Sequence, residues 1–130
     1  MSASKGDTTS RNSRTVLIAD DSERVRQSLS RMISCLPHLS LIGEARNGRE
    51  ALAAIRERRP DLVVLDVDMP EMTGLEVLEA MKAEGLGSKT IMFTGQAEEA
   101  YRQRCVDLGA AHFFEKATQL DEFLAVLKEL

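Results

Sequence analysis

Four short apolar runs of the sequence are each followed by side chains that can bind a metal ion or a phosphate group. These side chains are Asp20 with Asp21, Asp66, Thr94 and Lys116. Carboxylates are the hard oxygen ligands that suit Mg²⁺, while a hydroxyl and an ammonium group can bind the oxygens of phosphate. Close carboxylates also repel one another unless a cation neutralises them. These residue types together predict Mg²⁺-dependent chemistry on a phosphoryl group, with one carboxylate as the nucleophile.

The same side chains can act together only if the fold brings them to one place. The apolar runs are rich in β-branched residues and alternate with amphipathic segments of helical spacing, which predicts an α/β fold. The predicted strands cover residues 15–19, 39–45, 62–65, 90–93 and 111–115. We expect a doubly wound, five-stranded parallel sheet of order 2-1-3-4-5 with five helices, because this order brings the ends of strands 1, 3, 4 and 5 to one edge.

Capping signals mark where several of the helices begin. Asn47 and Thr73 precede helical patterns, and each is followed three residues later by a glutamate, Glu50 or Glu76, which is typical of a capping box. Thr118 precedes the last apolar stripe and is predicted to cap the final helix.

Composition sets the broad class of protein. With 130 residues, of which 43% are hydrophobic and 29% charged, the chain is predicted to form one soluble domain over 14–130 after a disordered, Ser/Thr-rich tail over 1–13. The net charge of −4 disfavours direct binding to nucleic acid, and no apolar run is long enough to cross a membrane. Cys35 and Cys105 lie far apart, as in proteins of reducing compartments, so we expect a cytoplasmic protein.

Taken together, the motifs resemble the response regulator receiver domain of two-component phosphorelay signalling, the CheY-like family. The resemblance rests on Asp20-Asp21, on the block 66–70 with Gly74, on Thr94-Gly95 and on 113–116. It covers about residues 14–130 and implies a flavodoxin-like fold. It also implies two kinds of partner, namely a sensor histidine kinase or histidine phosphotransfer protein that donates the phosphoryl group, and a downstream protein target.

The resemblance implies a role for each site residue. Asp66 would accept the phosphoryl group, while Thr94 and Lys116 would bind its oxygens. The implied ligands of Mg²⁺, for which Mn²⁺ would substitute, are Asp20 chiefly through water, Asp21, Asp66 and the backbone carbonyl of Asp68. Phe113 would act with Thr94 as a switch, turning inward on phosphorylation.

A phosphoryl group on Asp66 adds negative charge and acceptor oxygens, so it would pull on the loops that carry Thr94 and Lys116. The surface of the fourth helix, fifth strand and fifth helix would then change its affinity for the target, as a monomer or a phosphorylation-dependent dimer. Beyond self-phosphorylation and autodephosphorylation, no enzymatic activity is expected. Ala117 stands where the family usually has proline after the lysine. The Lys116–Ala117 bond is therefore predicted to be trans, since a cis bond without proline costs about 3 to 4 kcal/mol.

Three alternatives remain open at this point. A haloacid-dehalogenase-like phosphatase also uses an Asp-x-Asp motif, which Asp66-Val67-Asp68 fits. That family places the motif after the first strand, however, and would leave Asp20-Asp21 unexplained. The second alternative is a receiver-fold interaction module that works without phosphorylation. The third is a flavodoxin-like redox protein, which the absence of a Ser/Thr/Gly-rich loop after the first strand disfavours.

Overall fold

The computed structural model describes residues 13–96 and 98–130, so the predicted tail over 1–13 lies outside the described residues except for Ser13. Five strands form one parallel sheet of order β2-β1-β3-β4-β5, as predicted. The strands are β1 (Arg14–Ala19), β2 (Leu39–Ala45), β3 (Leu62–Leu65), β4 (Lys89–Thr94) and β5 (His112–Glu115).

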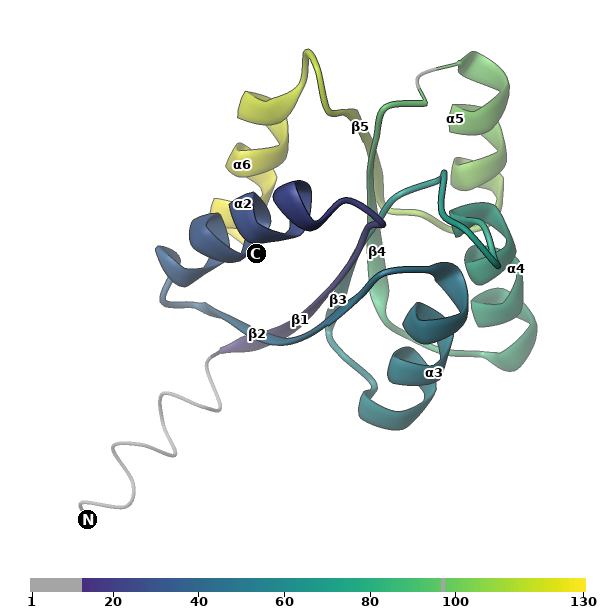
Figure 1. The fold of residues 1–130 in the computed structure, drawn as a ribbon, viewed down its shortest axis with the longest axis horizontal. Helices are drawn as coiled ribbons and strands as arrows, with labels where there is room; N and C mark the ends of the chain where they lie inside the picture. The colour runs from purple at the N-terminus through teal and green to yellow at the C-terminus, as the bar shows by residue number, and fades with distance from the viewer. Residues whose placement is uncertain (1–12, 97) are drawn as a thin grey trace.

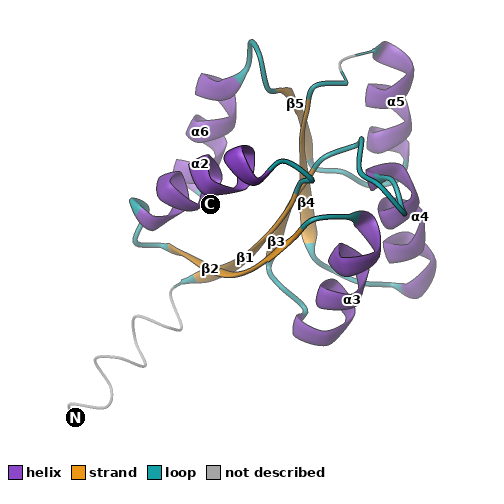
Figure 2. Cartoon of the chain, viewed as in Figure 1, coloured by secondary structure: helices purple, strands orange, loops and turns teal. Residues whose placement is uncertain are grey.

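Helices cover both faces of this sheet, which confirms the doubly wound α/β prediction (Figures 1 and 2). One face carries α2 (Glu23–Ser34) and α6 (Leu120–Glu129). The other face carries α3 (Gly48–Arg58), α4 (Gly74–Glu84) and α5 (Glu99–Asp107). Among the described residues, no helix combines the length and apolar character that a membrane span requires.

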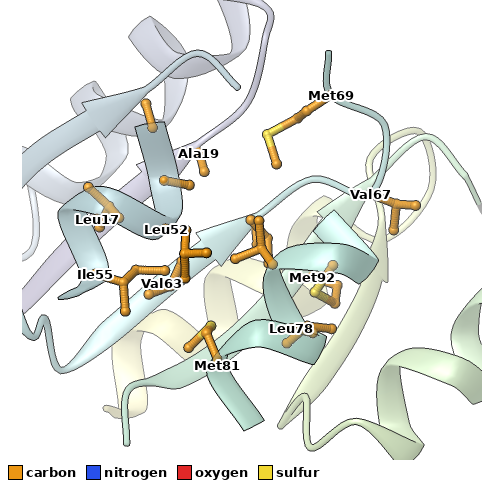
Figure 3. Packing of buried hydrophobic residues seen from close by; sticks show 14 of the residues in the cluster. Leu17, Ala19, Leu52, Ile55, Val63, Val67, Met69, Leu78, Met81 and Met92 are labelled. Carbon is orange, nitrogen blue, oxygen red and sulfur yellow. The ribbon is translucent and has the colours of Figure 1, made fainter. Parts of the chain in front are cut away.

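Two apolar layers hold the helices to the sheet. In the first, Figure 3 shows Ile55 of α3 near Val63 of β3, and Leu78 of α4 near Met92 of β4. The second layer lies under α2 and α6 and includes Ile33 and Phe123. Full burial of one such side chain contributes about 2 kcal/mol to the free energy of unfolding. All residues of β3 are buried, so the strand leading to Asp66 is anchored on both faces.

The capping signals at the starts of α3 and α4 are confirmed, with one difference of detail. Thr73 and Glu76 form a complete capping box, in which each backbone N–H donates to the other residue's side chain. The Asn47 side chain accepts from the N–H of Glu50 at 2.8 Å, but the Glu50 carboxylate accepts from the N–H of Arg46 at 3.0 Å. The Glu50 carboxylate therefore accepts from the N–H of Arg46, one residue before the Asn47 N–H that a capping box uses.

The cap predicted at Thr118 is wrong. The Thr118 hydroxyl donates to Glu115 Oε1 at 2.6 Å, and α6 begins at Leu120 after Gln119. A hydroxyl bonded to a carboxylate forms a charge-assisted hydrogen bond, which is stronger than a bond to a neutral N–H. None of the described residues forms a cis peptide bond. The prediction of a trans Lys116–Ala117 bond in this loop is therefore confirmed.

The two cysteines are free thiols in very different environments. Cys35 is exposed at the end of α2, whereas Cys105 is fully buried in α5, where burial raises the pKa of its thiol to about 11. We expect an alkylating reagent at mildly alkaline pH to modify Cys35 and leave Cys105 unmodified in the native protein, because the thiolate is the reactive form. Peptide mass spectrometry before and after denaturation measures this, and equal native labelling of both thiols would contradict it.

Candidate metal centre

Parallel pairing brings the ends of β1 and β3 side by side. Ala19 pairs with Leu65, so the next residues, Asp20 and Asp66, leave the sheet at the same level. The N–H of Asp66 donates to the carbonyl of Ala19 at 3.0 Å, which extends the ladder to the acidic residue itself. One carboxylate oxygen each from Asp20, Asp21 and Asp66 lie within 4.8 Å of one another. The fold therefore gathers the three predicted carboxylates into one oxygen cluster.

Two of these carboxylates are removed from water. Asp20 is 1% and Asp66 5% exposed, while Asp21 lies at the surface. Burial raises the pKa of Asp20 and the negative charge of Asp66 adds to this effect, although hydrogen bonds from Lys116 and the Ser22 N–H oppose it. Close, desolvated carboxylates need cationic partners to remain ionised. The cluster is accordingly a place where a cation is favoured.

Lys116 supplies one such cation from the end of β5. Its Nζ lies 2.7 Å from Asp20 Oδ2 and 3.1 Å from Asp66 Oδ2, so the ammonium group bridges the two buried carboxylates. Burial alone would lower the pKa of Lys116. The hydrogen bond to Asp20 and the two negative charges outweigh burial, and the pKa is raised. Lys116 is thus a charged partner of the acidic cluster.

The remaining predicted residues surround the cluster in different ways. Thr94 is fully buried at the end of β4, and its hydroxyl oxygen accepts a hydrogen bond from the N–H of Gln96 at 3.1 Å. The N–H of Asp68 donates to Asp66 Oδ1 at 3.3 Å, while the Asp68 side chain is exposed and not part of the three-carboxylate cluster. The loop after β3 therefore orients Asp66 through its backbone.

Phe113, the predicted switch residue, lies on β5 and is buried, being 5% exposed. The guanidinium of Arg102 on α5 stacks 4.7 Å from its ring centroid, and Arg102 Nη1 donates to the Phe113 carbonyl at 3.3 Å. Cation–π contacts of this kind contribute about 0.5–2 kcal/mol. Arg102 thereby ties α5 to the strand that leads to Lys116.

Three residues near the site have positions that sequence reasoning did not explain. A Cβ on Gly74 would lie 2.1 Å from the carbonyl oxygen of Asp66, so glycine is needed where α4 meets the acidic loop. Nothing in the sequence around Arg102 indicates its contact with Phe113. The burial of Arg26 could have been predicted, because it stands three residues before Leu29 and seven before Ile33, on the buried face of α2.

Comparisons with known proteins agree with this geometry. The profile of the response regulator receiver domain matches residues 16–128. The response regulator GacA of Pseudomonas syringae is 33% identical over 113 residues, which are 87% of this chain and 53% of GacA. The protein-glutamate methylesterase/protein-glutamine glutaminase of Treponema pallidum is 39% identical over 103 residues, which are 78% of this chain and 26% of that protein.

Solved structures give the same picture. The response regulator domain of Thermotoga maritima CheB is similar with a TM-score of 0.81 at 27% identity, covering 90% of this chain and 92% of that one. A CheY-like receiver domain protein from Methanospirillum hungatei has a TM-score of 0.79 at 26% identity, covering 90% and 92%. The chain spans about half the length of GacA and about a quarter of the methylesterase. These likenesses do not support the phosphatase or the flavodoxin-like alternative.

Proposed function

Because the chain belongs to the response regulator receiver family of two-component signalling, we propose that Asp66 accepts a phosphoryl group from a phosphohistidine. The donor is a sensor histidine kinase or a histidine phosphotransfer protein. A carboxylate oxygen of Asp66 attacks phosphorus, while the phosphorus–nitrogen bond breaks and its electron pair returns to the imidazole. The observation that carries this proposal is the carboxylate cluster within 4.8 Å, two members of which contact the Lys116 ammonium.

We propose that the acidic cluster holds Mg²⁺, with Mn²⁺ as a substitute. The proposed ligands are Asp20 chiefly through water, Asp21, Asp66 and the backbone carbonyl of Asp68. The donors are all oxygen atoms, as Mg²⁺ prefers. Three carboxylates face one ammonium group, which leaves two excess negative charges, the amount that a divalent cation neutralises. When bound, the ion supplies positive charge that offsets the repulsion between these carboxylates and the oxygens of the phosphoryl group.

The signal leaves the site through two coupled strand ends. Lys116 would redistribute its ionic contacts between the carboxylates and the new phosphoryl oxygens, and the Thr94 hydroxyl would donate to one of those oxygens. The N–H of Lys116 donates to the Thr94 carbonyl at 2.9 Å, so the ends of β4 and β5 move together. We propose that α5, β5 and α6 then change affinity for a downstream protein, with Phe113 taking part in the switch. The output is a change of binding, in a monomer or a phosphorylation-dependent dimer.

A receiver domain suits a regulator without enzymatic turnover. We propose that the chemistry of this chain is limited to its own phosphorylation and dephosphorylation. Direct contact with nucleic acid is not proposed, because the net charge of −4 gives no basic surface excess. We propose the cytoplasm as its compartment, since two free thiols suit a reducing environment.

The proposal is tested by incubating the wild-type chain with a small phosphodonor of the acetyl phosphate type. Intact-mass spectrometry should show one added phosphoryl group with Mg²⁺ and none when the ion is chelated. Sustained turnover of a phosphomonoester would favour the phosphatase alternative instead. No labelling by either the small donor or a kinase would favour an interaction module that works without phosphorylation.

Asp68→Asn should lengthen the lifetime of the Asp66 phosphate without preventing its formation. The exposed Asp68 carboxylate stands two residues from Asp66 and can act as a base toward an attacking water, whereas asparagine keeps the acceptor but loses the charge. We expect the lifetime to rise by up to about 100-fold, the lower end of what general-base assistance contributes. The decay of labelled protein after donor removal measures it. Asp107→Asn, which removes an exposed charge at the far end of α5, is the control, and equal lifetimes in all three proteins would refute the role.

A further inference from the structure

Arg26 of α2 is a charged residue that the fold buries beside the acidic cluster. The residue is only 9% exposed. Apart from the thiol of Cys105, the other buried ionisable residues in the described part of the chain are Asp20 and Asp66. Burying a guanidinium is costly unless its N–H groups are paired. The contacts of Arg26 therefore indicate why an arginine occupies this position on the inner face of the helix.

Those contacts join three elements. Arg26 Nη1 donates to the backbone carbonyl of Asp20 at 2.6 Å, and Arg26 Nε donates to Glu44 Oε1 at 3.2 Å. Glu44 lies on β2 next to Ala45, whose carbonyl accepts from the N–H of Asp20 at 3.0 Å. Arg26 thus connects α2 with the ends of both β1 and β2, directly at the residue that begins the acidic pair.

The carbonyl that Arg26 holds belongs to the peptide bond between Asp20 and Asp21. The orientation of this peptide plane influences the direction in which both side chains leave the backbone. The Asp20 carboxylate is held separately, by the N–H of Ser22 at 2.9 Å and by Lys116. The Arg26 contact is therefore a backbone constraint on the pair, additional to the contacts that orient the Asp20 carboxylate itself.

Charge pairing keeps this constraint compatible with a cation site. An unpaired guanidinium this close to the cluster would offset its negative charge and compete with a metal ion. Glu44 balances the guanidinium, so the pair adds no net charge while retaining the hydrogen bond to Asp20. A lysine could not serve both partners in the same way, because it lacks the planar fork of N–H groups.

We propose that Arg26, held by Glu44, is a positioning residue that orients Asp20 and Asp21 for metal binding. This inference rests on the proposed function, because it concerns the same metal site. Partners that orient metal ligands affect affinity even though they do not touch the ion, and their substitution typically weakens binding by about 10- to 100-fold. A purely structural arginine would instead change stability and leave the metal affinity of the folded protein unchanged.

The test is a Mg²⁺ titration followed by two-dimensional ¹H–¹⁵N NMR on the full chain, using the backbone amides of the acidic loops. Arg26→Lys should weaken Mg²⁺ binding by about tenfold. Glu44→Gln keeps an acceptor but leaves the guanidinium charge unbalanced, so it should weaken binding by a smaller factor. Arg31→Ala, an exposed arginine on the same helix, is the matched control and should bind Mg²⁺ as the wild type does.

The outcomes separate this inference from the function on which it rests. Folded Arg26→Lys protein with wild-type Mg²⁺ affinity would overturn the positioning role while leaving the proposed function intact. If Arg26→Lys does not fold, Glu44→Gln decides, and unchanged affinity in that variant overturns the role. A wild-type chain without saturable Mg²⁺ shifts near Asp20, Asp21 and Asp66 would overturn both proposals. The Mg²⁺-induced rise in melting temperature should follow the same order of variants.

Discussion

We expect Asp66→Asn to abolish labelling of the chain by a small phosphodonor in the presence of Mg²⁺. The carboxylate of Asp66 is the proposed nucleophile, and an amide cannot form the acyl phosphate because it lacks the anionic oxygen. Asparagine is nearly isosteric and keeps an oxygen that can accept from Lys116, so the fold should persist. Intact-mass spectrometry should find one added phosphoryl group on the wild type and none on the variant.

Two controls make this result specific. Asp68→Asn, two residues further along the same loop, should still be labelled, which shows that the loop tolerates the change from Asp to Asn. Circular dichroism and thermal melting of the Asp66→Asn protein should show a cooperative, folded domain. Labelling of Asp66→Asn to the wild-type extent would assign the acceptor to another carboxylate and would refute the proposed role of Asp66.

We expect Gly74→Ala to lower the free energy of unfolding by about 1–3 kcal/mol, because it forces a methyl group into an already packed position. The added Cβ would lie 2.1 Å from the carbonyl oxygen of Asp66 and 3.0 Å from the Cα of Val67, and neither backbone atom can move independently of the loop. The N–H of Gly74 donates to the Val67 carbonyl at 2.8 Å, so relief of the clash also strains this bond. Urea denaturation measures the loss.

Gly87→Ala is the matched control for the same chemical change. A Cβ at Gly87 meets no atom within 4 Å, so its effect on the free energy of unfolding should stay within about 0.5 kcal/mol. Any Gly74→Ala protein that remains folded should also be labelled more slowly at Asp66, since the loop must shift. Equal stability of the two variants would show that α4 can shift without loss of stability. It would contradict the close approach of Gly74 to the Asp66 carbonyl.

Much of the fold could be predicted because its signals are local. The apolar run 62–65 specifies a strand buried on both faces, and the structure buries every residue of it. Asn47 and Thr73 specify helix starts because the capping contact spans only three residues. The sheet order was predicted because it brings the ends of strands 1, 3, 4 and 5 to one edge, and the observed order agrees.

The sequence could predict which residues meet at the candidate site, but not how they contact one another. Acidic residues at the ends of parallel strands must meet at one edge, which is enough to expect Asp20 near Asp66. The bridging position of Lys116, 2.7 Å from Asp20 and 3.1 Å from Asp66, depends on how the last strand ends beside the others. The cap expected at Thr118 failed for a related reason, because its hydroxyl found a carboxylate acceptor in the folded loop.

Residue order along the chain was therefore sufficient for the class of fold, the succession of strands and helices, and the residues that gather at the sheet edge. Packing decided that Arg26 braces the Asp20 backbone, that Arg102 covers Phe113, and that Gly74 must lack a side chain. Periodicity and capping act within a few residues and leave a pattern that can be read locally. A buried charge or a close backbone approach depends on distant segments that only the folded chain brings into contact.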